Sequence, residues 1–333
     1  MSDRYLVTAS PHLRSRDSTP TIMWSVVGSL VPIIAFAVYY FGPSAVLVML
    51  AAVVGAVGTE AAWGKKGAVR DGSAAITGIL LGLCLPAGLP LWMAVLGGAF
   101  SIGFGKLIFG GLGQNIFNPA LLGRAFLQAA FPVALTTWPA VEGVSWWSLR
   151  GDNFALPLMS AQVDAVTAAT PLGLMKFERV LTPVADLAFG TTGGSLGETG
   201  AILILLCGGY LALRNYLNWR IPASILITVA VCTAVLHLID ASRYPTPQFM
   251  LLSGGLMLGA VYMATDMVTS PVTHRGAWIF GAGVGFLVVV IRMWGGLAEG
   301  VMYAILIMNA LVPFINRATQ PRVFGTSRQK APA

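Results

Sequence analysis

Charged residues are scarce in this chain of 333 residues: Asp, Glu, Lys and Arg together make up 10%, whereas hydrophobic residues make up 56%. A soluble globular domain carries a charged fraction nearer to one quarter. This balance excludes an ordinary soluble enzyme and predicts an integral membrane protein with helices in lipid. The 39 glycines and 13 methionines fit close helix packing in that environment.

Cysteine and histidine are also scarce. The cysteines are Cys84, Cys207 and Cys232, and the histidines are His12, His237 and His274. Each cysteine lies in a different apolar segment, and no CxxC, CxxCH or ferredoxin spacing occurs, which argues against haem c or a complete iron–sulfur site within this chain. Because no clustered set of ligands exists, we expect no metal site.

The net charge of +7 does not indicate a nucleic-acid partner, because the basic residues stand singly between apolar blocks rather than in one patch. The first twenty residues contain Arg4, Arg14 and Arg16 and few apolar residues, so they do not read as a cleavable signal peptide. Membrane topology accounts for these basic residues better than nucleic-acid binding does.

Ten apolar runs are candidates to cross a bilayer, where an intact helix needs about 20 residues and a broken one needs fewer. They fall at residues 23–41, 44–63, 72–86, 90–108 and 118–132, and again at 198–214, 220–239, 248–265, 276–294 and 297–315. The sequence therefore predicts an all-α polytopic membrane protein with about ten transmembrane helices, arranged as five plus five.

The two halves also resemble each other in short stretches. Residues 78–82 resemble 255–259, and residues 109–112 resemble 294–297, although matches this short also arise by chance in a chain rich in Gly and Leu. With an odd number of spans in each half, the second half begins on the opposite side of the membrane and therefore has the inverted topology. We therefore expect two inverted five-helix repeats with broken helices, the pattern of transporter folds.

The distribution of Lys and Arg predicts the orientation. With the N-terminus in the cytoplasm, fifteen of these residues lie inside, among them Lys106 and Arg124, and five lie outside, among them Arg292. The expected organisation is a cytoplasmic segment 1–22, a first repeat 23–132, an extracytoplasmic loop 133–197, a second repeat 198–316 and a basic cytoplasmic tail 317–333.

The long loop contains a small, hydroxyl-rich segment, Asp164 to Pro171. Thr167 and Thr170 flank two alanines, so little bulk shields Thr170, and Pro171 biases Thr170 toward an extended conformation. This arrangement can present a hydroxyl for modification. The alternative is an ordinary helix start, with Thr170 as N-cap and Pro171 at the first helical position.

Polar residues interrupt two of the apolar runs. In the first, Gln114 and Asn115 precede Asn118, which can cap a helix opened by Pro119 and so direct a positive helix end into the protein. In the second, Asp266 lies close to membrane depth, where an acid is costly and marks a functional candidate. The alternatives are a plain helix cap and a cytoplasmic turn. We expect Asp266, Gln114, Asn115 and Asn118 to be candidates for an ion pathway.

The segment around Thr170 resembles the flavinylation signal Asp-x-x-[Ser/Thr]-Gly-Ala-Thr, whose last threonine carries FMN through a phosphoester bond. Asp164, Thr167, Ala169 and Thr170 match this signal, and Ala168 stands where glycine is usual. The resemblance implies covalent FMN on Thr170, attached by a flavin transferase that works on the extracytoplasmic side.

Four segments, at residues 71–78, 110–121, 194–199 and 264–271, resemble the RnfD/NqrB family, and the similarity runs from about residue 20 to 317. The amino-acid sequence of the second segment most resembles that of the D-type membrane subunit of the Rnf complex. The resemblance implies a bacterial inner-membrane subunit that couples electron transfer between ferredoxin and NAD+ to Na+ or H+ translocation. It implies partners of the Rnf A, B, C, E and G types, and it leaves open a non-covalent riboflavin among the helices.

The chain contains no NADH fingerprint and no cluster ligands, so we expect the electron donor and acceptor sites to lie on partner subunits. Alone it is expected to catalyse no dehydrogenation. Two alternatives remain open from the sequence. One is the B-type subunit of the Na+-translocating NADH:quinone reductase, and the other is a transporter without flavin, because inverted five-helix repeats also resemble urea and ammonium channels.

Overall fold

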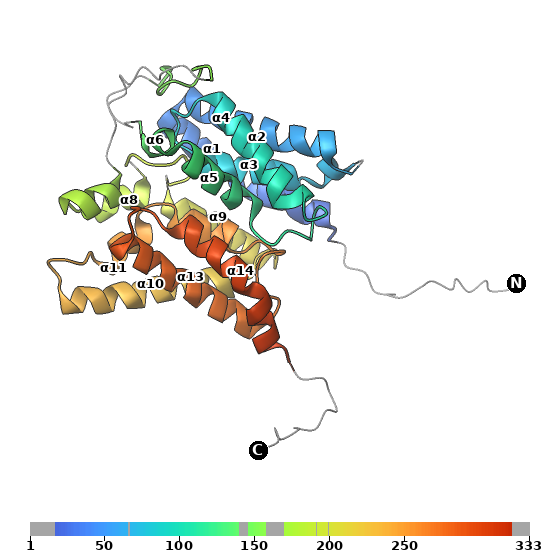
Figure 1. Cartoon of the computed structure of the whole chain (residues 1–333). Helices are drawn as coiled ribbons and strands as arrows, with labels where there is room; N and C mark the ends of the chain where they lie inside the picture. Colours follow the sequence, from blue (N-terminus) through green and yellow to red (C-terminus); the bar gives the residue numbers. More distant parts are fainter. Residues whose placement is uncertain are drawn as a thin grey trace, which may run out of the picture.

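The computed structural model describes residues 17–65, 67–139, 146–157, 170–190, 192–198 and 200–321, and every regular element in them is a helix (Figure 1). Asp164 and Thr167 of the flavinylation segment lie outside the described residues. The first half of the chain, blue to green, occupies the upper part of Figure 1, and the second half, yellow to red, occupies the lower part. The predicted all-α class is confirmed for the described residues.

The helices of the first half follow the predicted apolar runs. They are α1 (Thr19–Phe41), α2 (Pro43–Trp63), η1 (Ala68–Asp71), α3 (Ser73–Leu83), α4 (Leu91–Ile102) with its π-helical continuation η2 (Gly103–Leu107), α5 (Pro119–Ala130) and α6 (Pro132–Thr136). Side-chain caps begin two of them, because Ser18 accepts a hydrogen bond from the Thr21 N–H and Asn118 accepts from the N–H groups of Ala120 and Leu121.

Short helices connect the halves, and a broken segment lies inside the second half. The connecting helices are α7 (Pro171–Gly173), the π-helical η3 (Leu174–Glu178) and α8 (Val184–Phe189). The second half comprises α9 (Ala201–Leu213), α10 (Arg220–Ile239), α11 (Pro247–Leu252), α12 (Leu256–Leu258), the π-helical η4 (Gly259–Met263), α13 (His274–Trp294) and α14 (Val301–Thr319).

Each predicted run contains helix, but the runs differ in length. Within the described residues, five helices are long and apolar enough to cross a membrane, namely α1, α2, α10, α13 and α14. The others are shorter, such as α3 with 11 residues, α5 with 12 and α9 with 13. The run at 248–265 is divided between α11, α12 and η4, with a break at residues 253–255, which lies before the interruption that the sequence predicts around Asp266.

Glycine permits the closest helix crossings in both halves. A Cβ atom on Gly98 of α4 would lie 2.2 Å from the Ala52 carbonyl oxygen of α2, and one on Gly281 of α13 would lie 2.6 Å from the Ser224 Cβ of α10. Any larger residue would therefore push the two backbones apart. The second and fourth predicted runs thus pack against each other in both halves, as α2 with α4 and as α10 with α13.

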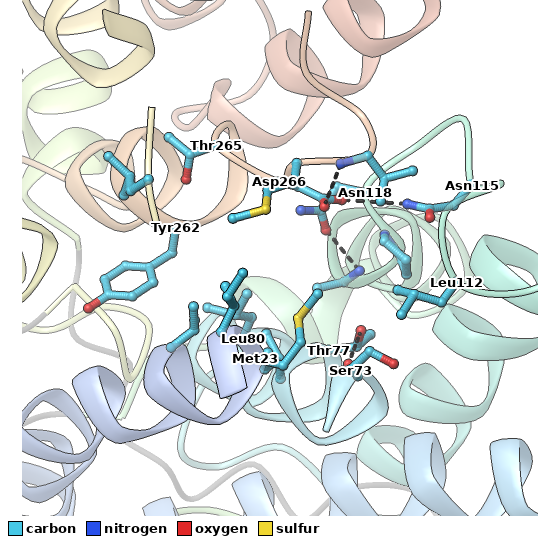
Figure 2. Close-up of a pocket in the computed structure, with 18 of the residues that line it drawn as sticks. Met23, Ser73, Thr77, Leu80, Leu112, Asn115, Asn118, Tyr262, Thr265 and Asp266 are labelled. Atoms are coloured by element: carbon cyan, nitrogen blue, oxygen red, sulfur yellow. Dashed lines mark hydrogen bonds between the residues drawn. The ribbon is translucent and has the colours of Figure 1, made fainter. Parts of the chain in front are cut away.

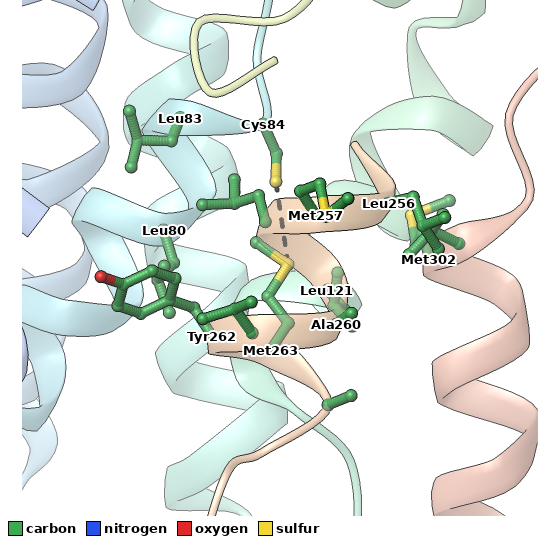
Figure 3. Packing of buried hydrophobic residues seen from close by; sticks show 14 of the residues in the cluster. Leu80, Leu83, Cys84, Leu121, Leu256, Met257, Ala260, Tyr262, Met263 and Met302 are labelled. Carbon is green, nitrogen blue, oxygen red and sulfur yellow. Dashed lines mark hydrogen bonds between the residues drawn. The ribbon is translucent and has the colours of Figure 1, made fainter. Parts of the chain in front are cut away.

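The broken segment of the second half is buried in the hydrophobic core (Figure 3). Leu80 and Cys84 approach it from the first half, and the Cys84 thiol lies 3.9 Å from the Met263 sulfur. Met302 of α14 lies on its other side. A hydrogen bond of 3.1 Å between the Ser29 and Tyr262 hydroxyls also crosses between the halves. The two halves therefore share one hydrophobic core.

The described chain begins and ends at the same end of the bundle (Figure 1). The Tyr216 hydroxyl donates to Asp17 at 2.9 Å, just before α1, and the Val272 N–H donates to Asn316 near the end of α14 at 3.1 Å. Thr170 instead shares a cavity with residues at the start of α14, so it lies at the opposite end. Two functional regions can therefore be described, one toward each end.

The outer surface of the bundle is apolar. Only 28% of the most apolar 18-residue stretch of α10 is buried, and Ile227, Val231 and Leu238 on this helix are exposed. A surface of this kind needs lipid or another protein to cover it. Together with the five long apolar helices, it identifies a multi-pass membrane protein.

Three residues that the charge count treats as topology markers are buried instead. Lys106, Arg124 and Arg292 have exposed fractions of 3%, 8% and 0%. Lys106 pairs with Glu60, and both arginines pair with Glu299. Their use as loop charges is therefore wrong, because charges inside apolar helices are satisfied by partners rather than by water. Without these three residues, the side assigned to the cytoplasm still carries more Lys and Arg residues than the opposite side.

Candidate functional site

Thr170 begins the short helix α7. Its backbone is extended, with φ −69° and ψ 151°, and its hydroxyl oxygen accepts a hydrogen bond of 3.1 Å from the Gly173 N–H. The predicted cap at Thr170 and the first helical position of Pro171 are confirmed. The cap uses a lone pair of the oxygen, whereas esterification replaces the hydroxyl hydrogen. Capping and modification of Thr170 are therefore compatible.

Thr170 lines a cavity of about 100 Å³, which we call the Thr170 cavity. Its other lining residues are Arg124, Gln128, Leu135, Thr136, Trp138, Pro171, Leu172, Glu198, Gly254, Leu297, Ala298, Glu299, Met302 and Tyr303. A cavity needs roughly 10–15 Å³ to hold one water molecule, so the Thr170 cavity has room for several. Mostly apolar walls with a few polar groups are typical of a site for an organic ligand.

Lys176 fixes the position of Thr170 relative to the second half. Its ammonium group donates to the carbonyl oxygens of Gly295 and Leu297 at 2.5 and 2.7 Å. Both carbonyls lie between α13 and α14, next to the cavity wall. Partial burial lowers the pKa of Lys176. The segment after Thr170 is therefore tied to the segment that lines the other side of the cavity.

A buried ion-pair cluster forms one wall of the Thr170 cavity. Glu299 lies between two arginines, with one carboxylate oxygen 3.6 Å from Arg124 and the other 3.7 Å from Arg292. The Gly255 N–H also donates to Glu299, at 2.6 Å. Because each guanidinium comes from a different helix, Glu299 joins α5 and α13 to the loop before α14.

The break between α11 and α12 supports this cluster. Arg292 donates to the carbonyl oxygens of Met250 and Ser253 at 2.8 and 3.0 Å. Gly254 has φ +66°, and a Cβ there would lie 2.6 Å from Leu172 and 3.0 Å from Glu299. Only glycine combines this backbone conformation with such close neighbours. The broken helix therefore positions Arg292 and Glu299 together.

A second carboxylate, Glu198, also lines the cavity. The Ser195 hydroxyl donates to it at 2.8 Å. The neighbouring Gly197 N–H donates to the Leu83 carbonyl oxygen at 2.6 Å, and a Cβ on Gly197 would lie 2.6 Å from Leu258. The segment at 194–198 is thus held against both α3 and α12, which places Glu198 at the cavity.

The residues of the Thr170 cavity fit a tethered flavin. Trp138 and Tyr303 offer aromatic surface for a planar ring, and Thr170 offers the attachment oxygen. The Nε of Arg124 is buried and, among the described residues, has no hydrogen-bond partner. A buried donor without a partner is unfavourable. The positive charge of Arg124 at the cavity wall suits a ligand that carries negative charge.

The two polar interruptions lie close together in space (Figure 2). The cavity beside them is also lined by Tyr216, which contacts Asp17 at the start of the described chain. The Asn115 amide donates to Asp266 at 3.5 Å, and the Asn118 amide donates to the Met263 carbonyl oxygen at 3.0 Å. Asn118 also caps α5, which confirms the predicted helix cap. Its side chain therefore both begins α5 and contacts the segment that leads to Asp266. Gln114 is exposed.

The interruptions border a second cavity, of about 110 Å³, which we call the break cavity. Its polar lining residues are Ser73, Thr77, Lys106, Asn115, Asn118, Tyr216, Tyr262, Thr265 and Asp266, and its apolar lining includes Met23, Leu80 and Leu112. Figure 2 shows Asn115, Asn118 and Asp266 grouped on one side, with Met23 and Leu80 from other helices. Gln114 does not line this cavity.

Asp266 carries the only carboxylate among the lining residues of the break cavity that the structure describes. Its oxygens accept from the Val268 N–H and the Thr269 hydroxyl, both at 3.2 Å. Within the described part of the chain it takes part in no ion pair. In the orientation that satisfies both neighbours, the Asn309 amide donates to the Thr269 carbonyl oxygen at 3.2 Å and accepts from the Asn118 N–H at 3.1 Å.

Lys106 lines the break cavity but is bound to other groups. Its ammonium group forms an ion pair with Glu60 of α2 and donates to the Ser73 hydroxyl at the start of α3. The Ser73 hydroxyl in turn donates to Asp71 at 2.6 Å. The charge of Lys106 is therefore compensated at the wall of the cavity, while Asp266 has neutral hydrogen-bond donors.

Sequence reasoning missed the charged cluster. Arg124, Glu299 and Arg292 were not recognised as site residues, although each lies in or beside an apolar run, where a charge is costly and marks a functional candidate. The same argument identifies Asp266. If this argument is applied to every charge near an apolar run, it also identifies Glu60 and Lys106. It would identify Arg124, Glu299 and Arg292 as well, but it does not predict which of these residues pair.

The sequence was compared with known proteins. The family model described as the NQR2, RnfD, RnfE family matches residues 6–325. The chain is 41% identical to the D component of the proton-translocating ferredoxin:NAD+ oxidoreductase complex of Clostridium ljungdahlii, with 97% of each chain covered. It is 41% identical to the D component of the ion-translocating oxidoreductase complex of Stutzerimonas stutzeri, with 95% of each covered.

A third relative is the D component of the Na+-translocating ferredoxin:NAD+ oxidoreductase complex of Acetobacterium woodii, which is 38% identical with 98% of this chain and 97% of the relative covered. Relatives named for H+ and for Na+ are thus similar to this chain to nearly the same degree. The family model and these relatives cover almost the whole chain, and the chain therefore belongs to the NQR2, RnfD, RnfE family.

Proposed function

We propose that this chain is the D-type membrane subunit of a bacterial Rnf complex, which carries FMN on Thr170 and couples electron transfer between ferredoxin and NAD+ to the movement of Na+ or H+. Its relatives are named as D components of ion-translocating oxidoreductase complexes. One structural observation supports the flavin most directly: the Thr170 oxygen lies at a cavity whose wall contains the buried cation Arg124.

The protein would contribute position and surroundings, while the bound flavin would supply one-electron and two-electron chemistry. Thr170 would hold the phosphate end, and the tie from Lys176 would keep that attachment point against the second half. Leu172, Met302 and Tyr303 would exclude water from the ring. A covalent tether keeps the cofactor in place in every redox state, whatever its affinity for the cavity.

Partner subunits of the Rnf A, B, C, E and G types would supply the electron donor and acceptor. The exposed apolar faces of α10 and α13 offer surface for lipid and for these partners. We propose no catalysis by this chain alone. The near alternative, the B-type subunit of the quinone reductase, shares the family, and identification of the co-purifying subunits would separate the two.

The break cavity is the proposed site of ion movement. Asp266, Asn115 and Asn118 gather there from two distant parts of the chain, and a carboxylate can bind Na+ or carry H+. Gln114, the fourth candidate, is exposed outside the cavity lining. The ion pathway is therefore expected to depend on the first three residues.

The attachment of flavin can be tested by denaturing electrophoresis of the chain produced together with a flavin transferase. The unsubstituted chain should fluoresce under ultraviolet light, and Thr170→Ala should lose the signal. Thr136→Ala is the matched control, because Thr136 lines the same cavity but is no attachment site. Thr167→Ala should only slow attachment. A fluorescent Thr170→Ala chain would place the flavin elsewhere, and a dark unsubstituted chain would favour a transporter without flavin.

The proposed orientation has both termini in the cytoplasm, Thr170 outside it, and two inverted five-helix repeats. Reporter fusions after Lys66 and after Arg322 should read cytoplasmic, and a fusion within residues 140–160 should read extracytoplasmic. The packing of α2 on α4 and of α10 on α13 supports the repeat. Fusions after Lys66 and within 140–160 that report the same side would contradict it.

A non-covalent flavin such as riboflavin, at a site among the helices, is a further part of the proposal. Acid precipitation of the purified complex should release this flavin and leave the covalent one with the protein. Flavin found only in the pellet would remove the non-covalent cofactor from the proposal.

A further inference from the structure

Arg124 is the one cationic side chain that lines the Thr170 cavity, as far as the described residues go. It is 8% exposed and lies on α5, one turn before Gln128, which lines the same cavity. The other arginine that pairs with Glu299, Arg292, does not line the cavity and donates hydrogen bonds to two backbone carbonyl oxygens. The two arginines therefore have different surroundings.

The charge of Arg124 is only partly compensated by its ion pair. Glu299 is shared between Arg124 and Arg292 at nearly equal distances, 3.6 and 3.7 Å. Glu198 also lines the cavity, but among the described residues Arg124 forms an ion pair with Glu299 alone. The Nε of Arg124 has no partner within the described residues. A guanidinium at a cavity wall places a positive charge where it suits an anionic, planar group.

We propose that Arg124 positions the flavin ring in the Thr170 cavity and raises its reduction potential by stabilising the negative charge of the reduced ring. This inference rests on the proposed attachment of FMN to Thr170. Arg124 acts here as a charged contact of the cofactor, and no proton or electron passes through it.

The charge balance gives the direction of the effect. Two electrons and one proton convert the oxidised ring into a reduced form with one additional negative charge. In the experiment below, dithionite supplies the electrons and the buffer supplies the proton. A nearby cation lowers the free energy of the negative form more than that of the neutral form, so its removal makes reduction less favourable.

The test is a redox titration of the isolated full-length chain after labelling by flavin transferase, with Thr170→Ala as the spectral baseline. Arg124→Gln should decrease the equilibrium constant for reduction at least tenfold, which is a shift of about −30 mV for two electrons. Arg124→Lys should restore most of the shift, because it retains the charge. Arg243→Gln, an exposed arginine outside the cavity lining, is the control and should leave the potential unchanged.

A second pair of variants keeps the test decisive if Arg124→Gln fails to fold. Gln128 is half-buried and lines the same cavity, so it can accept a charge at lower cost. Gln128→Lys should raise the potential, and Gln128→Glu should lower it. Shifts of the reduction potential in opposite directions require the flavin ring to lie near Gln128. A purely structural role of α5 would not produce them.

Each outcome has a distinct meaning. A labelled Arg124→Gln chain with an unchanged potential overturns the inference while leaving the flavin on Thr170. If that variant does not accumulate, unchanged potentials in both Gln128 variants overturn it. Loss of covalent flavin from the unsubstituted chain would instead contradict the proposed function, so the two failures can be told apart.

Discussion

The two cavities differ in how their charges are compensated. In the Thr170 cavity, the carboxylate of Glu299 lies within 4 Å of two guanidinium groups, at 3.6 and 3.7 Å, and the cluster is joined to the backbone of a broken helix. In the break cavity, Asp266 has an amide, a hydroxyl and a backbone N–H as donors, and no cation among the described residues pairs with it. The charges of the first cavity are joined in ion pairs, whereas the carboxylate of the second takes part in no ion pair among the described residues.

This difference separates two tasks. A cluster of paired charges is rigid, and losing one member leaves the others buried without a partner. Such a cluster suits a cofactor that must stay in place. A carboxylate with neutral donors can exchange a bound cation or a proton without breaking an ion pair, which suits ion movement. The comparison therefore predicts mainly structural damage from loss of Glu299 and mainly functional damage from loss of the Asp266 charge.

The largest expected effect is that of Glu299→Ala. It leaves both Arg124 and Arg292 without their carboxylate and should cost about 3–5 kcal/mol of folding free energy. The measurement is the thermal denaturation of the detergent-solubilised chain, together with its yield in membranes. Glu178→Ala is the control, since Glu178 is exposed. A Glu299→Ala chain as stable as the original would show that the cluster does not hold the fold together.

Asp266→Asn should leave the fold intact but abolish most ion translocation in the assembled complex. The amide keeps the size of the carboxylate and can still accept from Thr269, yet it lacks the charge that binds a cation. The measurement is ion uptake by membrane vesicles, after assembly and Thr170 flavin have been checked. Asp240→Asn, in the turn after α10, is the matched control, because its hydrogen bonds to Ser242 are exposed. Uptake at the original rate would remove Asp266 from the pathway.

Asn118→Ala should have an intermediate effect on stability. It removes the cap of α5 and the donor to the Met263 carbonyl oxygen, which together should cost roughly 2 kcal/mol. Asn118→Ser retains a capping oxygen and should recover about 1 kcal/mol of this loss. Thermal denaturation checks both values. Equal stabilities of the Ala and Ser variants would mean that the cap contributes little at this position.

Gln114→Ala should have the smallest effect. Gln114 is exposed and does not line the break cavity, so the change in stability should stay within about 0.5 kcal/mol. Ion uptake should also remain at the original rate. If Gln114→Ala impaired uptake as strongly as Asp266→Asn, the pathway would have to extend beyond the break cavity to the exposed loop.

The sequence alone determined the features that depend on neighbouring residues. The shortage of charge and the apolar runs fixed the membrane class and the approximate helix positions. The pairs Asn118-Pro119 and Thr170-Pro171 fixed two helix starts, because the side chain of an N-cap bonds to N–H groups only two or three residues later. The attachment of FMN to Thr170 and the ion pathway remain predictions.

Only the tertiary structure decided which distant groups meet. Asn115 and Asp266 are separated by 151 residues, and their contact depends on how α5 and η4 pack. The pairing of Glu299 with Arg124 and Arg292 is equally invisible in one sequence, because a charge in an apolar run shows that a partner is needed but not where it lies. Local hydrogen bonds are set by spacing along the chain, whereas buried ion pairs are set by the packing of whole helices. That packing brings Thr170 to the cavity that Arg124 lines.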